Sequence, residues 1–139
     1  MKVKRTETGF ILVLDIGDEV IASLKKLAAA ERIGMAEMSG IGAVRDAVLG
    51  YIDLDRKHYL RREFPDSMEL VSLTGNMALL DGEPFAHCHA VLGDREMRTS
   101  GGHLFQATVS LTVEIFLRVY EGRITRRFDT DSGANLIVL

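Results

Sequence analysis

Several residue types are scarce in this chain of 139 residues, and each scarcity excludes a class of protein. The chain has one cysteine, two prolines and no tryptophan. A single cysteine cannot form an internal disulfide, so the fold must be held by a packed core. Low cysteine use is typical of reducing compartments, and we therefore expect a cytoplasmic protein.

The chain also lacks a basic excess and a long apolar run. Lys plus Arg is 17 and Asp plus Glu is 20, which gives a net charge of −3. Proteins that bind nucleic acid through its phosphates usually carry a basic excess, so this charge argues against a general polyanion binder. The apolar run at 10–14 is too short for a signal peptide, and no uncharged stretch reaches the ~18 residues of a transmembrane helix. We expect no membrane segment.

What is present predicts one folded domain over residues 1–139, because 47% of the residues are hydrophobic and 27% are charged. Residues 18–33 repeat apolar side chains at helical spacing and reach a plausible stop at Gly34. Other segments alternate or are rich in β-branched residues, and we predict strands there: 10–16, 36–54, 57–64, 68–75, 85–92, 107–120 and 135–139. One principal helix among many strands, without a βαβ rhythm, predicts an α+β fold built mainly on antiparallel sheet.

Three of the four histidines fall within seventeen residues. In a strand, His87 and His89 share one face, while Cys88 between them points toward the core. His103 follows Ser100-Gly101-Gly102, a predicted turn that would swing a third imidazole back to the pair. Three imidazoles suit zinc or another divalent transition metal, with a fourth position open to water or a small-molecule ligand. The alternative is three ordinary histidines, each hydrogen-bonded at the surface or in the core.

Other polar residues carry weaker hypotheses. Glu114 is a candidate for orienting an imidazole or for general acid–base work, and it is equally well read as a solvated glutamate. Glu69 and Asp81 are weaker candidates of the same type. The remaining sites are expected to be structural or solvated: Gly40 and Gly42 in a tight turn, and His58, Arg61-Arg62 and Arg126-Arg127 at the surface.

Two motifs invite comparison with known families. A cupin interpretation would use Asp94 as a further ligand, but Gly82 stands one residue too close to His87. The runs Leu70–Asn76, Pro84-x-x-His87-x-His89-x-x-Leu92 and Gly101-Gly102-His103-Leu104, followed by Glu114, instead resemble the plant-and-prokaryote-conserved (PPC) domain. This resemblance covers nearly the whole chain.

The resemblance implies an α+β fold, a homotrimer and a metal held by His87, His89 and His103. The same fold is shared with acetolactate decarboxylase, a zinc enzyme that also uses three histidines. Plant members of the family follow AT-hook motifs in nuclear DNA-binding proteins, and this chain has no such hook.

Three hypotheses follow. The first is a trimeric metal-binding PPC protein with an unknown ligand or reaction. The second is a DNA-binding or regulatory association module, which the charge of −3 opposes. The third is a metal-dependent lyase or hydrolase for a small carboxylate or carbonyl compound, with Glu114 and a nearby arginine such as Arg95 or Arg98 assisting the metal. Whether the chain is an enzyme is left open.

Overall fold

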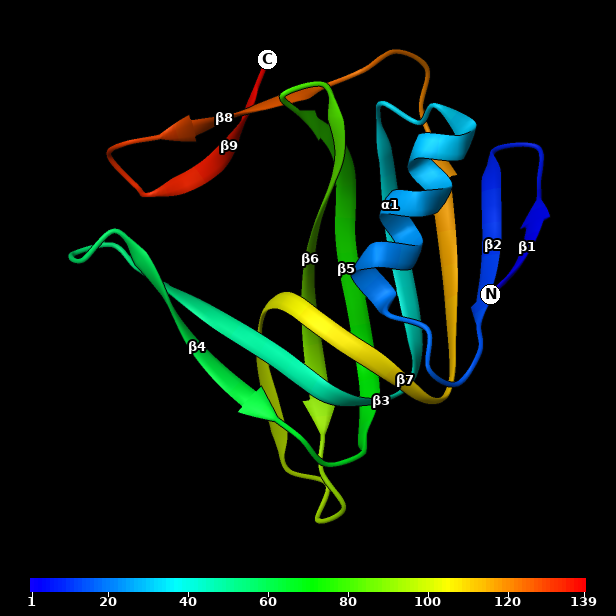
Figure 1. Ribbon diagram of the computed structural model, residues 1–139, viewed down its shortest axis with the longest axis vertical. Coiled ribbons are helices and arrows are strands. Elements are labelled where there is room, and N and C mark those ends of the chain that lie inside the picture. Colours follow the sequence, from blue (N-terminus) through cyan, green and yellow to red (C-terminus); the bar gives the residue numbers. More distant parts are fainter.

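The computed structural model describes residues 1–139 as nine strands and one helix (Figure 1). The predicted α+β architecture, mainly antiparallel with one principal helix, is confirmed. The elements are β1 (Lys2–Arg5), β2 (Gly9–Leu14), α1 (Val20–Glu31), β3 (Ala36–Asp53), β4 (His58–Phe64), β5 (Met68–Leu80), β6 (Glu83–Gly93), β7 (Thr99–Val119), β8 (Thr125–Asp129) and β9 (Ala134–Val138). The short strands β1 and β8 were not predicted.

Helix α1 forms where the sequence predicts it and is tied to the sheet at its first turn. The carboxylate of Glu19 caps the helix by accepting hydrogen bonds from the backbone N–H groups of Ile21 and Ala22. It also accepts one from the N–H of Ala107 on β7, at 3.1 Å. The helix ends at Arg32, whose φ of 55° is left-handed, two residues before the predicted stop at Gly34. With 12 residues it is also the only helix, well short of the ~20 that cross a bilayer.

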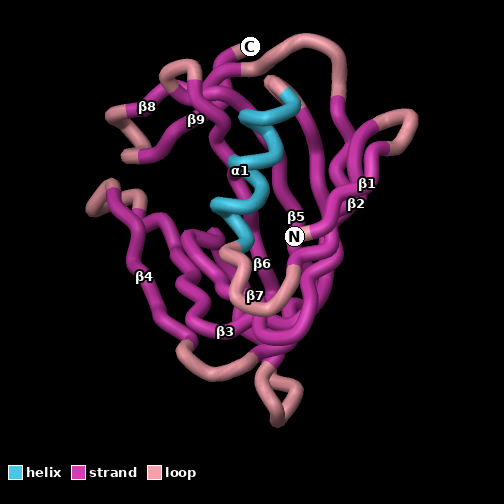
Figure 2. The backbone as a smooth tube through the Cα atoms, turned by 45° about the vertical axis from the view of Figure 1, so that its right-hand side comes forward, coloured by secondary structure: helices cyan, strands magenta, loops and turns pink.

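The strands form one strongly curved sheet. Its order is β1-β2-β7-β3-β5-β8-β9, with β4 paired to β3 and β6 paired to both β5 and β7. Every strand pairing is antiparallel except the short one between β5 and β8. Strands β3, β5, β6 and β7 each pair with two others of this group, so they close into a ring, and α1 lies within the curve of the sheet (Figure 2).

The hydrophobic core lies between α1 and the inner face of the sheet. Val109, Val113, Ile115 and Leu117 of β7 are buried, so the predicted period-two pattern holds from Val113 to Leu117. Leu111 departs from it and is 68% exposed, at the point where the pairing of β7 with β3 shifts register. Leu24 and Ala28 of α1 belong to the same cluster of buried side chains. Burial of these apolar groups is the main force that closes the strands around the helix.

Two glycines of β3 differ from the prediction. Gly40 and Gly42 lie within β3 instead of a tight turn, and the pairing of β3 shifts register between them. A Cβ at Gly42 would lie 2.1 Å from the backbone oxygen of Thr112 on β7. These glycines therefore permit close passage of neighbouring strands at an irregularity, a role that a sequence pattern cannot separate from a turn.

Candidate metal centre

Strand β6 presents alternate residues to opposite faces. Cys88 and its neighbour Ala86 are buried in the core, as predicted. The Cys88 thiol packs against the sulfur of Met38, and burial raises its pKa to about 12, so it is a poor ligand. On the other face His87 is half-buried and His89 is exposed.

His103 reaches this pair along a neighbouring strand. The residue pairing of β6 with β7 sets His103 directly opposite His89. The predicted turn at Gly101-Gly102 is wrong, because both glycines lie inside β7. A Cβ at Gly102 would lie 2.7 Å from the carbonyl oxygen of Gly50 on β3. The glycine thus lets β7 pass close to β3 on its way to the histidine position.

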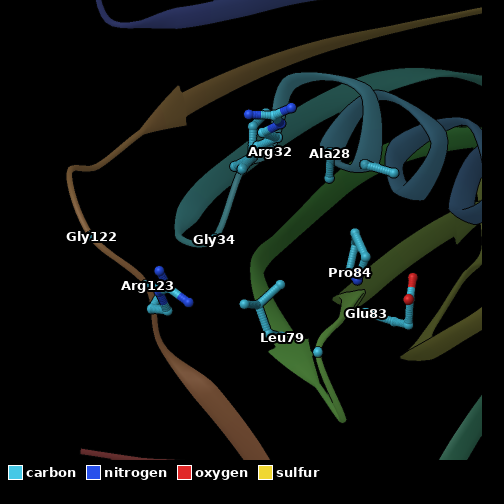
Figure 3. Close-up of a pocket in the computed structure, with 11 residues that line it drawn as sticks. Ala28, Arg32, Gly34, Leu79, Glu83, Pro84, Gly122 and Arg123 are labelled. Atoms are coloured by element: carbon cyan, nitrogen blue, oxygen red, sulfur yellow. The ribbon is translucent and has the colours of Figure 1, made fainter.

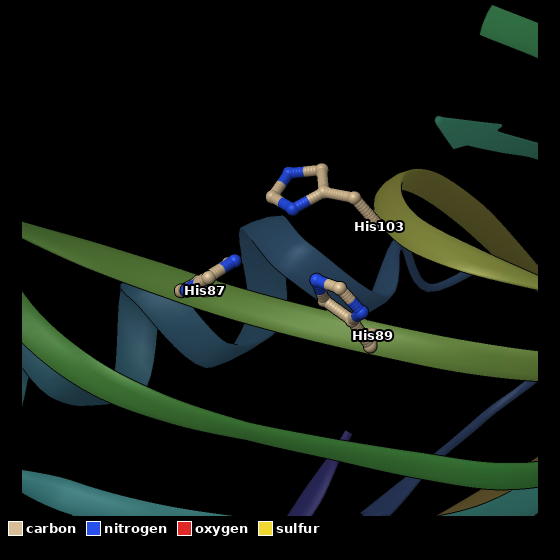
Figure 4. A group of neighbouring side chains, drawn as sticks. All are labelled: His87, His89 and His103. Carbon is tan, nitrogen blue, oxygen red and sulfur yellow. The ribbon is translucent and has the colours of Figure 1, made fainter. Parts of the chain in front are cut away.

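The three imidazoles face one another (Figure 4). Their ring centroids are 5.1 Å apart for His87 and His103, 5.3 Å for His87 and His89, and 5.6 Å for His89 and His103. One ligand atom from each ring lies within 4.8 Å of the others. Zinc–nitrogen bonds of about 2.0–2.1 Å in a tetrahedron place nitrogens about 3.3 Å apart, so modest side-chain rotations would bring the three rings onto one ion.

The electrostatics of the site favour neutral rings. Burial lowers the pKa of His87 to about 4, and the charges of Arg126 and His89 act in the same direction. The pKa of His103 is also lowered to about 4, first by burial and then by His87, His89, Arg61 and Arg126. Both rings are therefore neutral at pH 7, and a neutral imidazole is the form that binds a metal. The Nδ1 atom of His103 is buried without a hydrogen-bond partner, as fits a nitrogen awaiting a ligand.

Aromatic side chains form one wall of the site. The ring of Tyr59 on β4 lies 5.0 Å from that of His103, the ring of Phe105 lies 4.6 Å from it, and the Tyr59 and Phe105 rings are 5.1 Å apart. The guanidinium of Arg61 stacks over Phe105 at 4.0 Å. These contacts hold His103 in place and make this side of the site apolar, with a positive charge behind it.

Arg126 lies beside His87 and was not expected there. Its Nη2 donates to Oδ1 of Asn76 at 2.8 Å and to Nδ1 of His87 at 3.1 Å, and its Nη1 donates to the carbonyl of Asn135 at 2.7 Å. Only 7% of Arg126 is exposed, so the prediction of a solvated arginine is wrong for it and holds for its neighbour Arg127. Strand alternation gave the two residues opposite faces, but no local signal shows which face the β8–β9 hairpin turns inward.

The acid and base candidates lie elsewhere. Glu114 is exposed on β7 between Val13 of β2 and Ile41 of β3, eleven residues beyond His103, so the structure does not bring it to the histidines. Arg95 and Arg98 lie in the β6–β7 turn and pair there with Glu96 and Asp94. The spacing along the sequence suggested proximity for these groups, but the extended course of β7 carries them away.

The minor candidates are also accounted for. Glu69 is exposed on β5, and Asp81 is exposed in the turn that connects β5 to β6. His58 at the start of β4 is exposed, as predicted. The histidine cluster therefore contains no carboxylate.

A separate depression lies at the far end of the helix (Figure 3). It has a volume of about 450 Å³ and is lined by the charged residues Arg32, Glu83 and Arg123 and by the apolar residues Ala28, Leu79 and Pro84. It contains none of the histidines and gathers no group of metal-ligating side chains. The histidine cluster is therefore the candidate site for metal binding.

Comparisons with known proteins agree with this picture. The family model of the Plants and Prokaryotes Conserved (PCC) domain, also abbreviated PPC, matches residues 1–121. The match ends before β8, so the hairpin that carries Arg126 lies beyond it. No curated protein sequence matches the chain.

Solved structures cover almost the whole chain. A metal-containing protein from Archaeoglobus fulgidus is 37% identical, with a TM-score of 0.88 and 100% of both chains covered. A PPC protein from Pyrococcus horikoshii is 34% identical, with a TM-score of 0.86 over 97% of this chain and 92% of the other. A proposed DNA-binding protein from Ralstonia eutropha JMP134 is also 34% identical, with a TM-score of 0.91 over 99% of this chain and 96% of the other.

Proposed function

This chain belongs to the Plants and Prokaryotes Conserved domain family, and from that premise we propose that it is a metal-binding protein whose ligands are His87, His89 and His103. The observation that carries the proposal is the convergence of three imidazoles, one ligand atom from each lying within 4.8 Å of the others. The metal-containing relative from Archaeoglobus fulgidus adds support. A ligand set of nitrogens alone suits zinc better than magnesium or calcium, which prefer oxygen.

Three histidine ligands would leave one coordination position free. A zinc ion held in this way lowers the pKa of bound water and polarises carbonyl oxygens. The protein's own part is to hold the three rings neutral and oriented, with Tyr59 and Phe105 packed against His103. A reducing compartment such as the cytoplasm suits this chain, because its only cysteine is buried and unpaired.

Metal analysis of protein purified without a histidine tag tests the proposal. After incubation with zinc and removal of the excess, we expect about one equivalent per chain for the wild type. His58→Ala serves as the control, since His58 is exposed and outside the cluster. Retention of less than about a tenth of an equivalent by the wild type would contradict the proposal.

We further propose a homotrimer, which the family resemblance implies. Its support is the exposure of large apolar side chains on three adjacent strands, at Ile41 (58%), Val71 (52%) and Phe116 (59%). Phe116→Glu should reduce the particle mass measured by light scattering. The matched control is Phe128→Glu, which changes an equally exposed phenylalanine on the hairpin. A monomeric wild-type protein would rule the trimer out.

DNA binding is the second candidate function, because the relative from Ralstonia eutropha is a proposed DNA-binding protein. The net charge of −3 opposes it. Affinity for duplex DNA that falls steeply with salt would support this function, and absence of binding at low salt would exclude it.

A metal-dependent lyase or hydrolase is a further alternative. It would now have to work without Glu114, Arg95 or Arg98, since none of them lies with the histidines. A relationship to acetolactate decarboxylase stays a prediction.

A further inference from the structure

Arg126 is a buried cation without an anionic partner. Only 7% of it is exposed, and its hydrogen-bond acceptors are an amide oxygen, a backbone carbonyl and a histidine nitrogen. No carboxylate lies within salt-bridge distance of it, and its buried Nε has no partner at all. A guanidinium buried in this way costs free energy unless an anion accompanies it. Arg126 therefore has an unfilled requirement for an anionic partner.

Metal binding at His87 would also remove the hydrogen bond between Arg126 and His87. A guanidinium only donates hydrogen bonds, so Nδ1 of His87 must accept the one from Arg126. A neutral imidazole has one nitrogen with a free lone pair, and a metal needs that lone pair. If the metal takes Nδ1, it displaces Arg126 directly. If it takes Nε2, the proton moves to Nδ1, which can then no longer accept from Arg126.

Release from His87 frees one edge of the guanidinium. Nε has no partner, and Nη2 would keep its hydrogen bond to Asn76 while its other N–H becomes free. Nε and Nη2 share one edge of the planar guanidinium. Two parallel N–H groups on that edge match the two oxygens of a carboxylate. Because Arg126 is almost fully buried, only a small group can reach it.

We propose that Arg126 recognises the carboxylate of a small-molecule ligand of the histidine site, and that metal binding makes it available by ending its hydrogen bond to His87. This inference rests on the proposed metal-binding function and adds the chemical class of the ligand. The absence of acidic side chains from the cluster and the positive charge of Arg61 beyond Phe105 also favour an anion. Binding of metal and of carboxylate is therefore mutually favourable.

Acetate is a suitable probe, with acetamide as its neutral counterpart of the same shape. Both are titrated by NMR into zinc-loaded and metal-free protein, at constant ionic strength, for the wild type, Arg126→Gln and Arg127→Gln. We expect zinc-loaded wild type to bind acetate at least about tenfold more tightly than metal-free wild type or zinc-loaded Arg126→Gln. Arg127 is exposed on the opposite face, so Arg127→Gln should behave like the wild type, and acetamide should show no preference.

Zinc affinity without acetate gives an independent measurement. Arg126→Gln removes both a competitor for His87 and a nearby positive charge, so it should bind zinc at least as tightly as the wild type. Arg126→Lys keeps the positive charge but loses the pair of parallel N–H donors. It should bind acetate with intermediate affinity. It also provides a test if Arg126→Gln does not fold.

The two levels of the proposal fail in different ways. If zinc does not bind to the wild type, the proposed function falls, and this is seen before any acetate is added. If zinc binds but zinc-loaded wild type and both Arg126 variants bind acetate equally, the role of Arg126 is overturned and the metal site stands.

Discussion

The strand pair β6–β7 and the β8–β9 hairpin face the same site but are held in the molecule very differently. β6 is paired along both edges, to β5 and to β7, and its other face is packed in the core at Cys88. The hairpin joins the sheet through only two residue pairs, Leu79 with Thr125 and Leu80 with Arg126. The candidate metal ligands thus stand on the best-supported strands, and the arginine stands on one of the least supported.

This difference suggests a division of labour. Ligand atoms for a metal must be held within a few tenths of an ångström, which central strands achieve. A residue that changes partners needs room to move, and an element with few contacts to the sheet supplies it at low cost. Three variants, in order of decreasing expected effect, and a pH titration test this contrast.

Removing a histidine ligand from β6 should greatly weaken metal binding. His89→Ala should weaken zinc affinity by at least about a hundredfold, since even changes to residues that only support a ligand cost 10–100-fold. His89 is exposed, so the fold should survive, and unchanged thermal unfolding of the metal-free variant would show this. Zinc affinity within threefold of the wild type, measured by competition with a chelator, would contradict the role of His89.

The second largest effect is expected from adding a side chain at Gly102, where β7 passes close to β3 next to His103. Gly102→Ala places a Cβ only 2.7 Å from the carbonyl oxygen of Gly50. This overpacking should lower the free energy of unfolding by about 1–3 kcal/mol. Gly101→Ala is the matched control, because its nearest neighbours lie at 3.5 and 3.6 Å. Denaturant unfolding compares the two, and equal stabilities would refute the close-packing explanation of this double glycine.

Loosening the hairpin should have a smaller and more local effect. Asp129 closes its turn by accepting hydrogen bonds from the N–H and hydroxyl groups of Ser132. Asp129→Ala should raise amide hydrogen exchange in residues 125–138 by the equivalent of about 1 kcal/mol. Exchange in β6 and β7 should stay unchanged, and Asp131→Ala, which alters an exposed neighbour, is the control. Faster exchange throughout the sheet would show that the hairpin is not independent.

A further effect is expected from pH on the metal-free protein. The pKa values of His87 and His103 are lowered to about 4 by folding, from 6.5, so between these limits the unfolded chain binds more protons than the folded one. Stability from these groups is therefore complete above pH 6.5 and is lost as the pH falls toward 4. The melting temperature should fall between pH 7 and pH 4.5, and it should fall less in the double variant His87→Gln/His103→Gln. An identical fall in both proteins would assign the effect to other groups.

The parts predicted correctly were those with a local periodic signal. The helix over 18–33 matches α1 at Val20–Glu31, and the alternation of β7 from Val113 to Leu117 matches its burial. Leu111 was misassigned to the buried face, because β7 shifts register against β3 between Val109 and Val113. The shared face of His87 and His89 follows from strand geometry alone. Glu114 and Arg126 were misplaced because their positions depend on how distant strands pair. Residues close in the sequence do not encode that pairing.

The fold class, most strand faces and the three histidines that converge could be inferred from the sequence alone. These follow from side-chain periodicity and from the resemblance of the two histidine motifs to the PPC domain. The three-dimensional structure was needed to show that Gly101 and Gly102 lie within a strand, that Glu114 is remote, and that Arg126 reaches the site from a separate hairpin. The physical reason is that pairing between strands distant in the sequence is set by burial and packing of the whole sheet, and any one segment carries only a small part of that information.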